Sequence, residues 1–433
     1  MTHSCPNIKN TKLGFLGKFA FIVLIFSVAR GVIPLLTNNA NLARPTYTCS
    51  FVLCALFSLF GLHLALVKKN QMVSKQLRLL LIVNLALCVF WWIPVIIFSS
   101  GFNFKVTIFY MGLFPFAIFG FVRLPEKYLV IALITITLLV AGTIIWDFIE
   151  LNTTFISNGY DLAIKRQLLL RPESFMAFGN TAGLMRPVGI LGPHPHDAGN
   201  LLAILSVYWV AMLLREDRIK IGIFLIFVIA VIGMLMTQSA SNIVAFFVGI
   251  LFIIGVYRKK ILKFTKNLRI FPSILVVLII IFLFTKYLGI KVDMLWQWSK
   301  RISPEGAWGD MMAFGITDIG RDFFVALTGH GSSLELSKIG DVSEIGFVKL
   351  LMELGLISWI IFLIILVYPI WYYALSRSKN KQMALPYIAA LLVGFISLWH
   401  YGSVLRTTNE FVFLALYACA LRILAKEYLP KFS

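Results

Sequence analysis

Residues 128–147 read YLVIALITITLLVAGTIIWD, with no charged side chain before the final Asp147. A helix of about 20 apolar residues is long enough to cross the ~30 Å hydrocarbon core of a bilayer. Lipid offers the backbone no hydrogen-bond partners, so a spanning segment must be a helix or a strand of a closed barrel. The run lacks the alternation of a barrel strand. It therefore predicts a transmembrane helix.

Similar apolar runs recur along the 433-residue chain, in which 60% of residues are hydrophobic, 13% are charged and the mean hydropathy is +0.89. A soluble globular chain is about half apolar and about a quarter charged. The composition thus excludes a soluble enzyme, a disulfide-stapled secreted module and a disordered tail. We expect an all-α fold, a single polytopic transmembrane helix bundle over residues 1–433. About twelve spans are predicted: 15–36, 47–67, 79–99, 106–122, 128–147, 198–214, 221–237, 242–257, 270–289, 346–373, 383–401 and 408–425.

The distribution of Lys and Arg predicts the orientation of these spans. The termini and alternate connections on one side hold 24 of these residues, whereas short connections on the other side hold three, Arg44, Lys105 and Arg406. Positive charge is enriched in cytoplasmic connections. Both termini are therefore expected in the cytoplasm. The net charge of +20 is then a topology signal rather than a sign of nucleic-acid binding.

Two long connections, 148–197 and 290–345, are then expected outside the membrane. Both mix Gly, Pro and aromatic residues and carry several cationic side chains. Cationic clusters that face outward oppose the usual charge bias, and the planar Arg side chain pairs well with phosphate. A lipid-linked diphosphate fits this pattern, because its head group lies at the outer interface. No sequence repeat supports an inverted-repeat transporter.

The first long connection ends in MRPVGILGPHPHDAGN, residues 185–200, which leads directly into a predicted span. Pro and Gly predict a bent entry, and the amides at the start of the following helix attract anions. Arg186, His194 and His196 are the candidate functional residues of this segment. The alternative is a rigid interfacial turn with two solvated histidines.

The second long connection contains Gly320-Arg321-Asp322 and Gly329-His330-Gly331, and it ends at Glu344. Arg321 is a candidate diphosphate ligand, with a surface pair to Asp322 or Asp318 as the alternative. Glu344 is a candidate base or a helix cap. Three further candidate functional residues are His330 and, near the outer end of the eleventh span, His400 and Arg406.

These segments resemble the O-antigen polymerase and ligase superfamily of bacterial membrane glycosyltransferases. The similar elements are Arg186-Pro187-Val188-Gly189, Gly320-Arg321 with Gly329-His330-Gly331, and Glu344 followed by the stretch LLMELGL, residues 350–356. The number of spans, the cytoplasmic termini and the places of the two long outer loops are also similar. The resemblance implies a helical bundle of the GT-C-like kind.

Two differences from the superfamily bear on function. Ligases carry an outer-loop histidine just before the span with the E-x-G-L motif, where this chain has Ser343-Glu344, and this difference favours a polymerase. Many members also have Ser-Arg after the seventh span, whereas residues 237–241 here read TQSAS and lack the arginine.

The resemblance implies a polymerase that joins oligosaccharide repeat units on undecaprenyl diphosphate at the outer face of the bacterial inner membrane. Donor and acceptor are both lipid-linked oligosaccharides, and a chain-length regulator is a possible protein partner. The resemblance implies that Arg186 and Arg321 bind the diphosphate and that Glu344 acts as a base. The residues implied to position the sugars are His194, His196, His330, His400 and Arg406. No cofactor is expected. The outer loops lack a DxD motif, which favours a metal-independent reaction.

Two alternatives stay open. An O-antigen ligase uses the same donor with lipid A–core as the acceptor. A lipid-linked oligosaccharide flippase should gather its cations in a cavity within the spans, whereas here they lie mostly in the outer loops.

Overall fold

The computed structural model describes residues 14–67, 75–98, 113–153, 186–187, 189–191, 195–215, 220–265, 327, 346–376, 380–398 and 410–425. Within these ranges every regular element is a helix, and no strand occurs. The prediction of an all-α fold is confirmed for this part of the chain.

Five helices in these ranges are long and apolar enough to cross a membrane: α3 (Ala43–Val67), α7 (Glu126–Thr153), α9 (Pro195–Arg215), α11 (Ala240–Thr265) and α16 (Gly346–Leu375). Shorter apolar stretches form or lie within α1 (Phe15–Ala29), α4 (Lys75–Phe98), α10 (Ile221–Met236) and α17 (Lys381–Ser397). The remaining elements are α2 (Val32–Thr37), α6 (Ala117–Phe121), α18 (Glu410–Leu424), η1 (Ala40–Leu42) and η3 (Phe114–Phe116).

These lengths confirm a membrane protein, while the number of twelve spans stays a prediction. The predicted span 270–289 lies outside the described residues, as does the first part of span 106–122. Most of the two predicted outer loops, 148–197 and 290–345, also lies outside them. In the first of these loops, 148–153 extends α7 and 195–197 begins α9.

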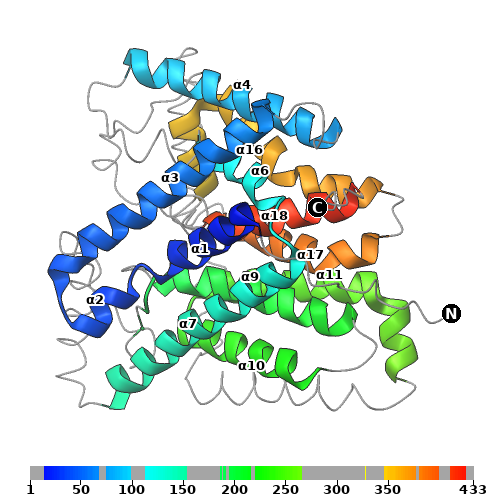
Figure 1. Ribbon diagram of the computed structural model, residues 1–433. Helices are drawn as coiled ribbons and strands as arrows, with labels where there is room; N and C mark the ends of the chain where they lie inside the picture. Colours follow the sequence, from blue (N-terminus) through cyan, green and yellow to red (C-terminus); the bar gives the residue numbers. More distant parts are fainter. Residues whose placement is uncertain are drawn as a thin grey trace, which may run out of the picture.

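Helix α9 is the centre of the bundle and packs against α7, α10, α11 and α17 (Figure 1). Of the most apolar 18-residue stretch of α9, 83% is buried inside the protein. Its large interior residues include Tyr208 and Trp209. Gly249 of α11 permits a close approach here, because a Cβ atom would lie 2.5 Å from Val393 of α17 and 2.8 Å from Val207 of α9. Small residues serve the same purpose in other membrane bundles.

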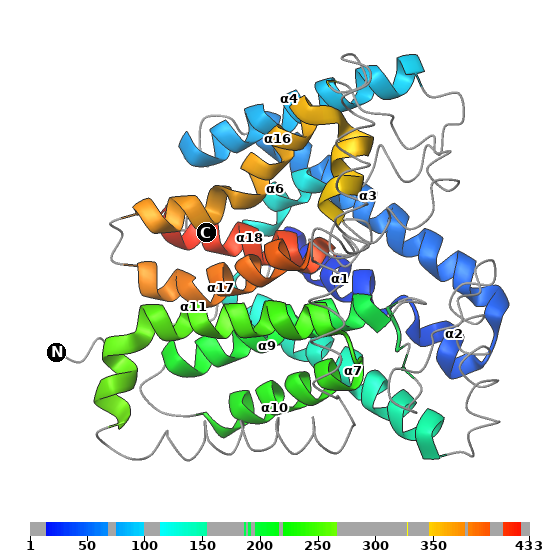
Figure 2. The same ribbon diagram turned by 180° about the vertical axis from the view of Figure 1, so that it is seen from behind.

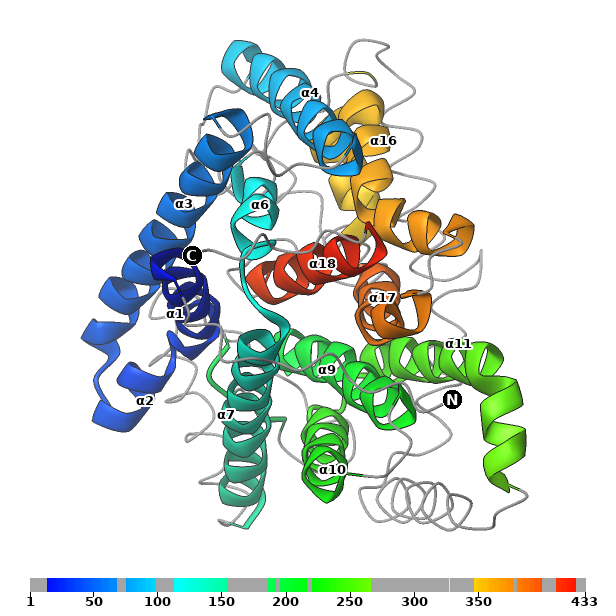
Figure 3. The same ribbon diagram turned by 45° about the vertical axis from the view of Figure 1, so that its right-hand side comes forward.

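A second buried helix, α18, lies between α6 and α17 (Figure 3). Seen from behind, α4 and α16 pack together at one edge of the bundle, and α10 lies at the opposite edge (Figure 2). Large apolar side chains of α3, α4 and α11 point outward from the protein, including Leu56, Ile82 and Leu251. Lipid covers such side chains in a membrane helix, so their exposure fits the predicted environment.

Two predicted spans are interrupted. The run 15–36 ends as α1 at Ala29 and resumes as α2 at Val32, with Arg30 and Gly31 between the two helices. The run 346–373 is divided at Gly355, whose φ of 70° and ψ of 168° are not helical. Apolar length did not reveal either break, because both runs are mostly hydrophobic. Their charged residues are Lys18 and Arg30 in the first run and Lys349 and Glu353 in the second.

The break in α16 predicts that Gly355 resists substitution. Its backbone lies in a region that only glycine adopts readily, so Gly355→Ala is expected to lower the free energy of unfolding by about 1–3 kcal/mol. The matched control is Gly255→Ala in α11, where no atom lies within 4 Å of the added Cβ. Thermal unfolding of the purified chain in detergent measures the stability of both variants. Equal stability would contradict the claim that Gly355 has a conformation that only glycine adopts readily.

Candidate functional site

Two of the eight residues predicted for the site, Arg186 and His196, lie in the described part of the chain. The structure brings both to one end of the bundle, where α9 begins and α10 passes into α11. We name the residues that meet there the junction cluster: Arg186, His196, Thr237, Ser239 and Asn242. The other six predicted residues lie outside the described residues: His194, Arg321, His330, Glu344, His400 and Arg406.

Arg186 is bound to the end of α10. Its Nε donates a hydrogen bond to the Thr237 carbonyl oxygen over 3.1 Å. Thr237 follows the last residue of α10, where helix carbonyls have no partner within the helix. A guanidinium at a helix C-terminus also interacts favourably with the helix dipole. This bond fixes a partly buried positive charge beside the connection from α10 to α11.

The turn that carries Arg186 is fastened to two other helices. The Gly189 N–H donates to Oδ2 of Asp147 on α7 over 2.8 Å. The Leu191 carbonyl accepts from Nη2 of Arg30, at the end of α1, over 2.6 Å. Gly189 has a φ of 63°, and a Cβ atom there would lie 2.8 Å from Cδ1 of Ile144. Glycine is therefore required in the Arg-Pro-Val-Gly sequence for both conformation and space.

His196 connects the first turn of α9 to the start of α11. Its Nδ1 lies 2.8 Å from Oγ of Ser239, and its carbonyl accepts from Nδ2 of Asn242 over 3.1 Å. Between α10 and α11, Gln238 has a φ of 53°, which is rare for a residue with a side chain. The N-termini of α9 and α11 therefore lie side by side, and both offer the positive end of a helix dipole.

This arrangement suits an anionic ligand that also carries hydroxyl groups. A guanidinium and two helix N-termini attract phosphate, and imidazole, amide and serine hydroxyl groups bind sugar hydroxyls. Within the described residues, no group of three His, Cys, Asp or Glu side chains lies close enough to hold a metal ion.

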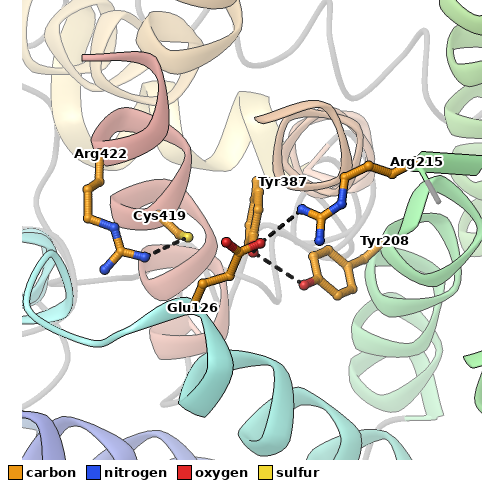
Figure 4. Close-up of polar contacts among 6 residues, drawn as sticks. All are labelled: Glu126, Tyr208, Arg215, Tyr387, Cys419 and Arg422. Carbon is orange, nitrogen blue, oxygen red and sulfur yellow. Dashed lines mark hydrogen bonds and ion pairs between the residues drawn. The ribbon is translucent and has the colours of Figure 1, made fainter. Parts of the chain in front are cut away.

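A second polar cluster, drawn in Figure 4, lies near the other end of α9. His196 and Arg215 are 19 residues apart on α9, which is about 28 Å along the helix. There, Oε1 of Glu126 on α7 accepts from Nη1 of Arg215 over 2.9 Å and from the Tyr387 hydroxyl of α17 over 2.9 Å. The Tyr208 hydroxyl lies 3.5 Å from that of Tyr387.

Arg422 of α18 extends this second cluster. Its Nη1 donates to the Val122 carbonyl over 3.2 Å and also to that of Leu124, and its Nη2 lies 3.4 Å from Sγ of Cys419 (Figure 4). These contacts fix the connection from α6 to α7 against α18. The second cluster consists of pairs that satisfy one another and join four helices, so we interpret it as structural and name it the clamp.

Sequence reasoning missed several residues of the junction cluster and its surroundings. Asp147 and Asn242 are buried polar residues at the ends of predicted spans, and nothing in the local sequence identifies their partners 42 and 46 residues away. Arg30 interrupts an apolar run, which is a signal for a buried contact. In the TQSAS stretch, residues 237–241, the sequence shows the lack of an arginine but not the contacts of Thr237 and Ser239 with Arg186 and His196.

Comparison with known proteins identifies no family. No protein-family model matches the chain, and no curated protein matches it.

The turn from Arg186 to Leu191 predicts a penalty for a side chain at Gly189. Gly189→Ala adds a Cβ in a left-handed conformation and against Ile144, so a loss of about 1–3 kcal/mol in the free energy of unfolding is expected. Gly142→Ala on α7 is the control, since its Cβ meets no atom within 4 Å. Denaturation in detergent measures the free energy of unfolding of both variants. If Gly189→Ala leaves it unchanged, the left-handed conformation and the close contact with Ile144 do not restrict this position.

The clamp predicts a measurable coupling between Glu126 and Arg215. Their side chains are 29% and 20% exposed, so solvent weakens the pair and a coupling energy of about 0.5–1 kcal/mol is expected. A double-mutant cycle with Glu126→Gln and Arg215→Gln, read by thermal unfolding, gives this value. Strictly additive single effects would show that the ion pair contributes nothing to stability.

Proposed function

We propose that this chain is a polymerase that joins lipid-linked oligosaccharide repeat units, with undecaprenyl diphosphate as the leaving group. The single observation that carries the proposal is the position of Arg186, held at the α10–α11 connection beside the N-termini of α9 and α11. This is a site for a diphosphate at the end of a membrane-spanning helix.

The position along the bundle supports a lipid-linked ligand. The candidate span of α9 runs from His196 to Arg215, so its first residue lies at the level where a lipid head group meets the hydrocarbon. A polyprenyl chain then lies in the membrane while its diphosphate reaches the junction cluster. A free nucleotide sugar needs no such placement.

The reaction requires a positive environment for the leaving group. An acceptor hydroxyl attacks the anomeric carbon of the donor, the bond from that carbon to the diphosphate breaks, and negative charge builds on the diphosphate oxygen. Fixed guanidinium donors stabilise this charge in the transition state. In the proposal Arg186 and Arg321 bind the diphosphate, Glu344 acts as a base, and His194, His196, His330, His400 and Arg406 position the sugars.

The contact between Arg186 and Thr237 also bears on the missing Ser-Arg pair. The TQSAS stretch has no arginine of its own, but Arg186 brings a guanidinium to its first residue from 51 positions away. We infer that Arg186 supplies the positive charge that the resembled superfamily places in this connection.

The wider setting is part of the proposal. We place the enzyme in the bacterial inner membrane, with both termini in the cytoplasm and the junction cluster at the outer face. It needs no metal or cofactor in this proposal and works with a chain-length regulator. The choice of polymerase over ligase depends on Ser343-Glu344, which lies outside the described residues.

The glycolipid profile of cells with Arg186→Ala tests the proposal. Turnover is expected to fall by roughly 10²–10³-fold, by analogy with the loss of one oxyanion donor, so lipid A–core carries a single repeat unit. Arg321→Ala is expected to give the same profile. The control is Arg258→Ala, an exposed arginine of α11 far from the cluster.

Other glycolipid profiles would contradict the proposal and indicate a different function. Bare core with long polymer retained on the polyprenyl carrier would identify a ligase. Loss of all surface repeat units, with single units accumulating on the inner leaflet, would identify a flippase. If the glycolipid of Arg186→Ala has the same chain-length distribution as wild type, this arginine has no role in the reaction.

A further inference from the structure

Two buried charged side chains hold the turn from Arg186 to Leu191. Asp147, near the end of α7, is 2% exposed, and Arg30, between α1 and α2, is 7% exposed. The Asp147 carboxylate accepts from the Gly189 N–H over 2.8 Å, and the Arg30 guanidinium donates to the Leu191 carbonyl over 2.6 Å. The turn is therefore bonded to two separate parts of the chain, through backbone groups only two residues apart.

Charged side chains are a costly way to satisfy two backbone groups. A neutral hydroxyl or amide could bond each of them, whereas burial removes the water that stabilises a carboxylate or a guanidinium. Charge-assisted hydrogen bonds are shorter and stronger than neutral ones, so they restrict the position of the turn more closely. Ionisable residues inside membrane bundles commonly mark functional sites. The cost therefore indicates that the exact place of this turn matters.

The two side chains also have opposite charges. A carboxylate alone beside the junction cluster would repel an anionic ligand. Arg30 bonds the same turn and offsets this charge, and its place over the Tyr47 ring, 5.0 Å from the centroid, favours a cation. Together, Asp147 and Arg30 hold the turn without adding net negative charge near Arg186.

The helices to which Arg186 is attached pack closely together. Asp147 lies on α7, which packs against α9 and α10. An added Cβ at Gly233 of α10 would lie 2.9 Å from Ala141 of α7, so these two helices approach closely. Thr237, whose carbonyl accepts from Nε of Arg186, directly follows α10. The turn and the guanidinium are therefore attached to the same packed pair of helices.

The segment between these two attachments is short and restricted. Pro187 is buried, and its ring limits φ. Gly189 has a φ of 63° and lies against Ile144. A shift of the turn is therefore passed on to Arg186.

We propose that Asp147 and Arg30 are positioning residues for the glycosyl transfer, because they hold Arg186 where negative charge develops on the diphosphate. This inference rests on the polymerase proposed above. Neither side chain touches the substrate, and both act through the turn. A displacement of about 1 Å at a catalytic group lowers a rate by about 10²-fold. Loss of either bond is thus expected to lower kcat by about 10–10²-fold with little change in KM.

The first test is a double-mutant cycle on kcat, measured with the purified chain in vesicles and polyprenyl-diphosphate-linked repeat units. Asp147→Ala is expected to lower kcat in the wild-type chain but not further in Arg186→Ala, and Arg30→Met to behave in the same way. A role confined to stability would lower turnover equally with and without Arg186. Glu150→Ala, three residues further along α7 and bonded to Trp146, is the control and keeps normal kcat. Effects that multiply in the double variant would overturn the inference, as would normal kcat in Asp147→Ala.

The second test separates the length of the side chain from its charge. Asp147→Asn keeps the length and an acceptor oxygen, whereas Asp147→Glu keeps the charge and adds a methylene group. Positioning predicts a kcat within about tenfold of wild type for Asp147→Asn and a fall of about 10²-fold for Asp147→Glu. Thermal unfolding in detergent identifies the variants that fold. If Asp147→Glu is as active as Asp147→Asn, the inference is overturned.

The third measurement needs no variant. Hydrogen exchange of the wild-type chain, followed by mass spectrometry, reports on the Gly189 N–H that Asp147 binds. Exchange is expected to be at least about 10²-fold slower than in an unstructured peptide. Exchange as fast as in that peptide would show that the turn opens freely and would overturn the inference. Slow exchange in a wild-type chain that forms no product in the first test would count against the polymerase and, with it, the role of Asp147 and Arg30 in catalysis.

Discussion

Backbone groups without a partner in their own helix control the arrangement of this bundle. Lipid cannot satisfy them, so each break or end of a helix needs a donor or acceptor from elsewhere in the chain. Arg186 bonds the carbonyl of Thr237, just after α10, Arg30 bonds that of Leu191, and Arg422 bonds two carbonyls between α6 and α7. The three arginines thus join segments that lie far apart in the sequence. Two of them, Arg30 and Arg186, create the surroundings of the proposed site.

The two ends of the bundle differ in a way that matters for function. In the clamp, one carboxylate accepts from both an arginine and a tyrosine across α7, α9 and α17. Those groups satisfy one another and hold the helices in place. The junction cluster instead brings a guanidinium and two helix N-termini to one place, together with hydroxyl, amide and imidazole groups. One end therefore provides a rigid frame, and the other provides donors for a ligand.

Much of the fold follows from apolar length, but the site does not. The runs 47–67, 128–147, 198–214 and 242–257 each correspond to one long helix, because a continuous hydrophobic stretch has no other stable form in lipid. The breaks at Arg30 and Gly355 depend on local conformation within hydrophobic sequence, and length does not reveal them.

The contacts of the site required the structure. Pro and Gly around Arg186 and His196 mark both residues in the sequence. Their partners Thr237 and Asn242, and the contact of Asp147 with Gly189, come only from the packing of α7, α10 and α11 against α9.

The most direct test of the account is the product formed by the purified chain in lipid vesicles with a synthetic polyprenyl-diphosphate-linked repeat unit as the sole substrate. The account predicts lipid-linked products of two or more units, released polyprenyl diphosphate in equal number to the new glycosidic bonds, and loss of both in Arg186→Ala. If the repeat units stay single, and the addition of lipid A–core as an acceptor then gives transfer, the polymerase is contradicted and the chain is a ligase. Repeat units that only move between leaflets would contradict glycosyl transfer altogether.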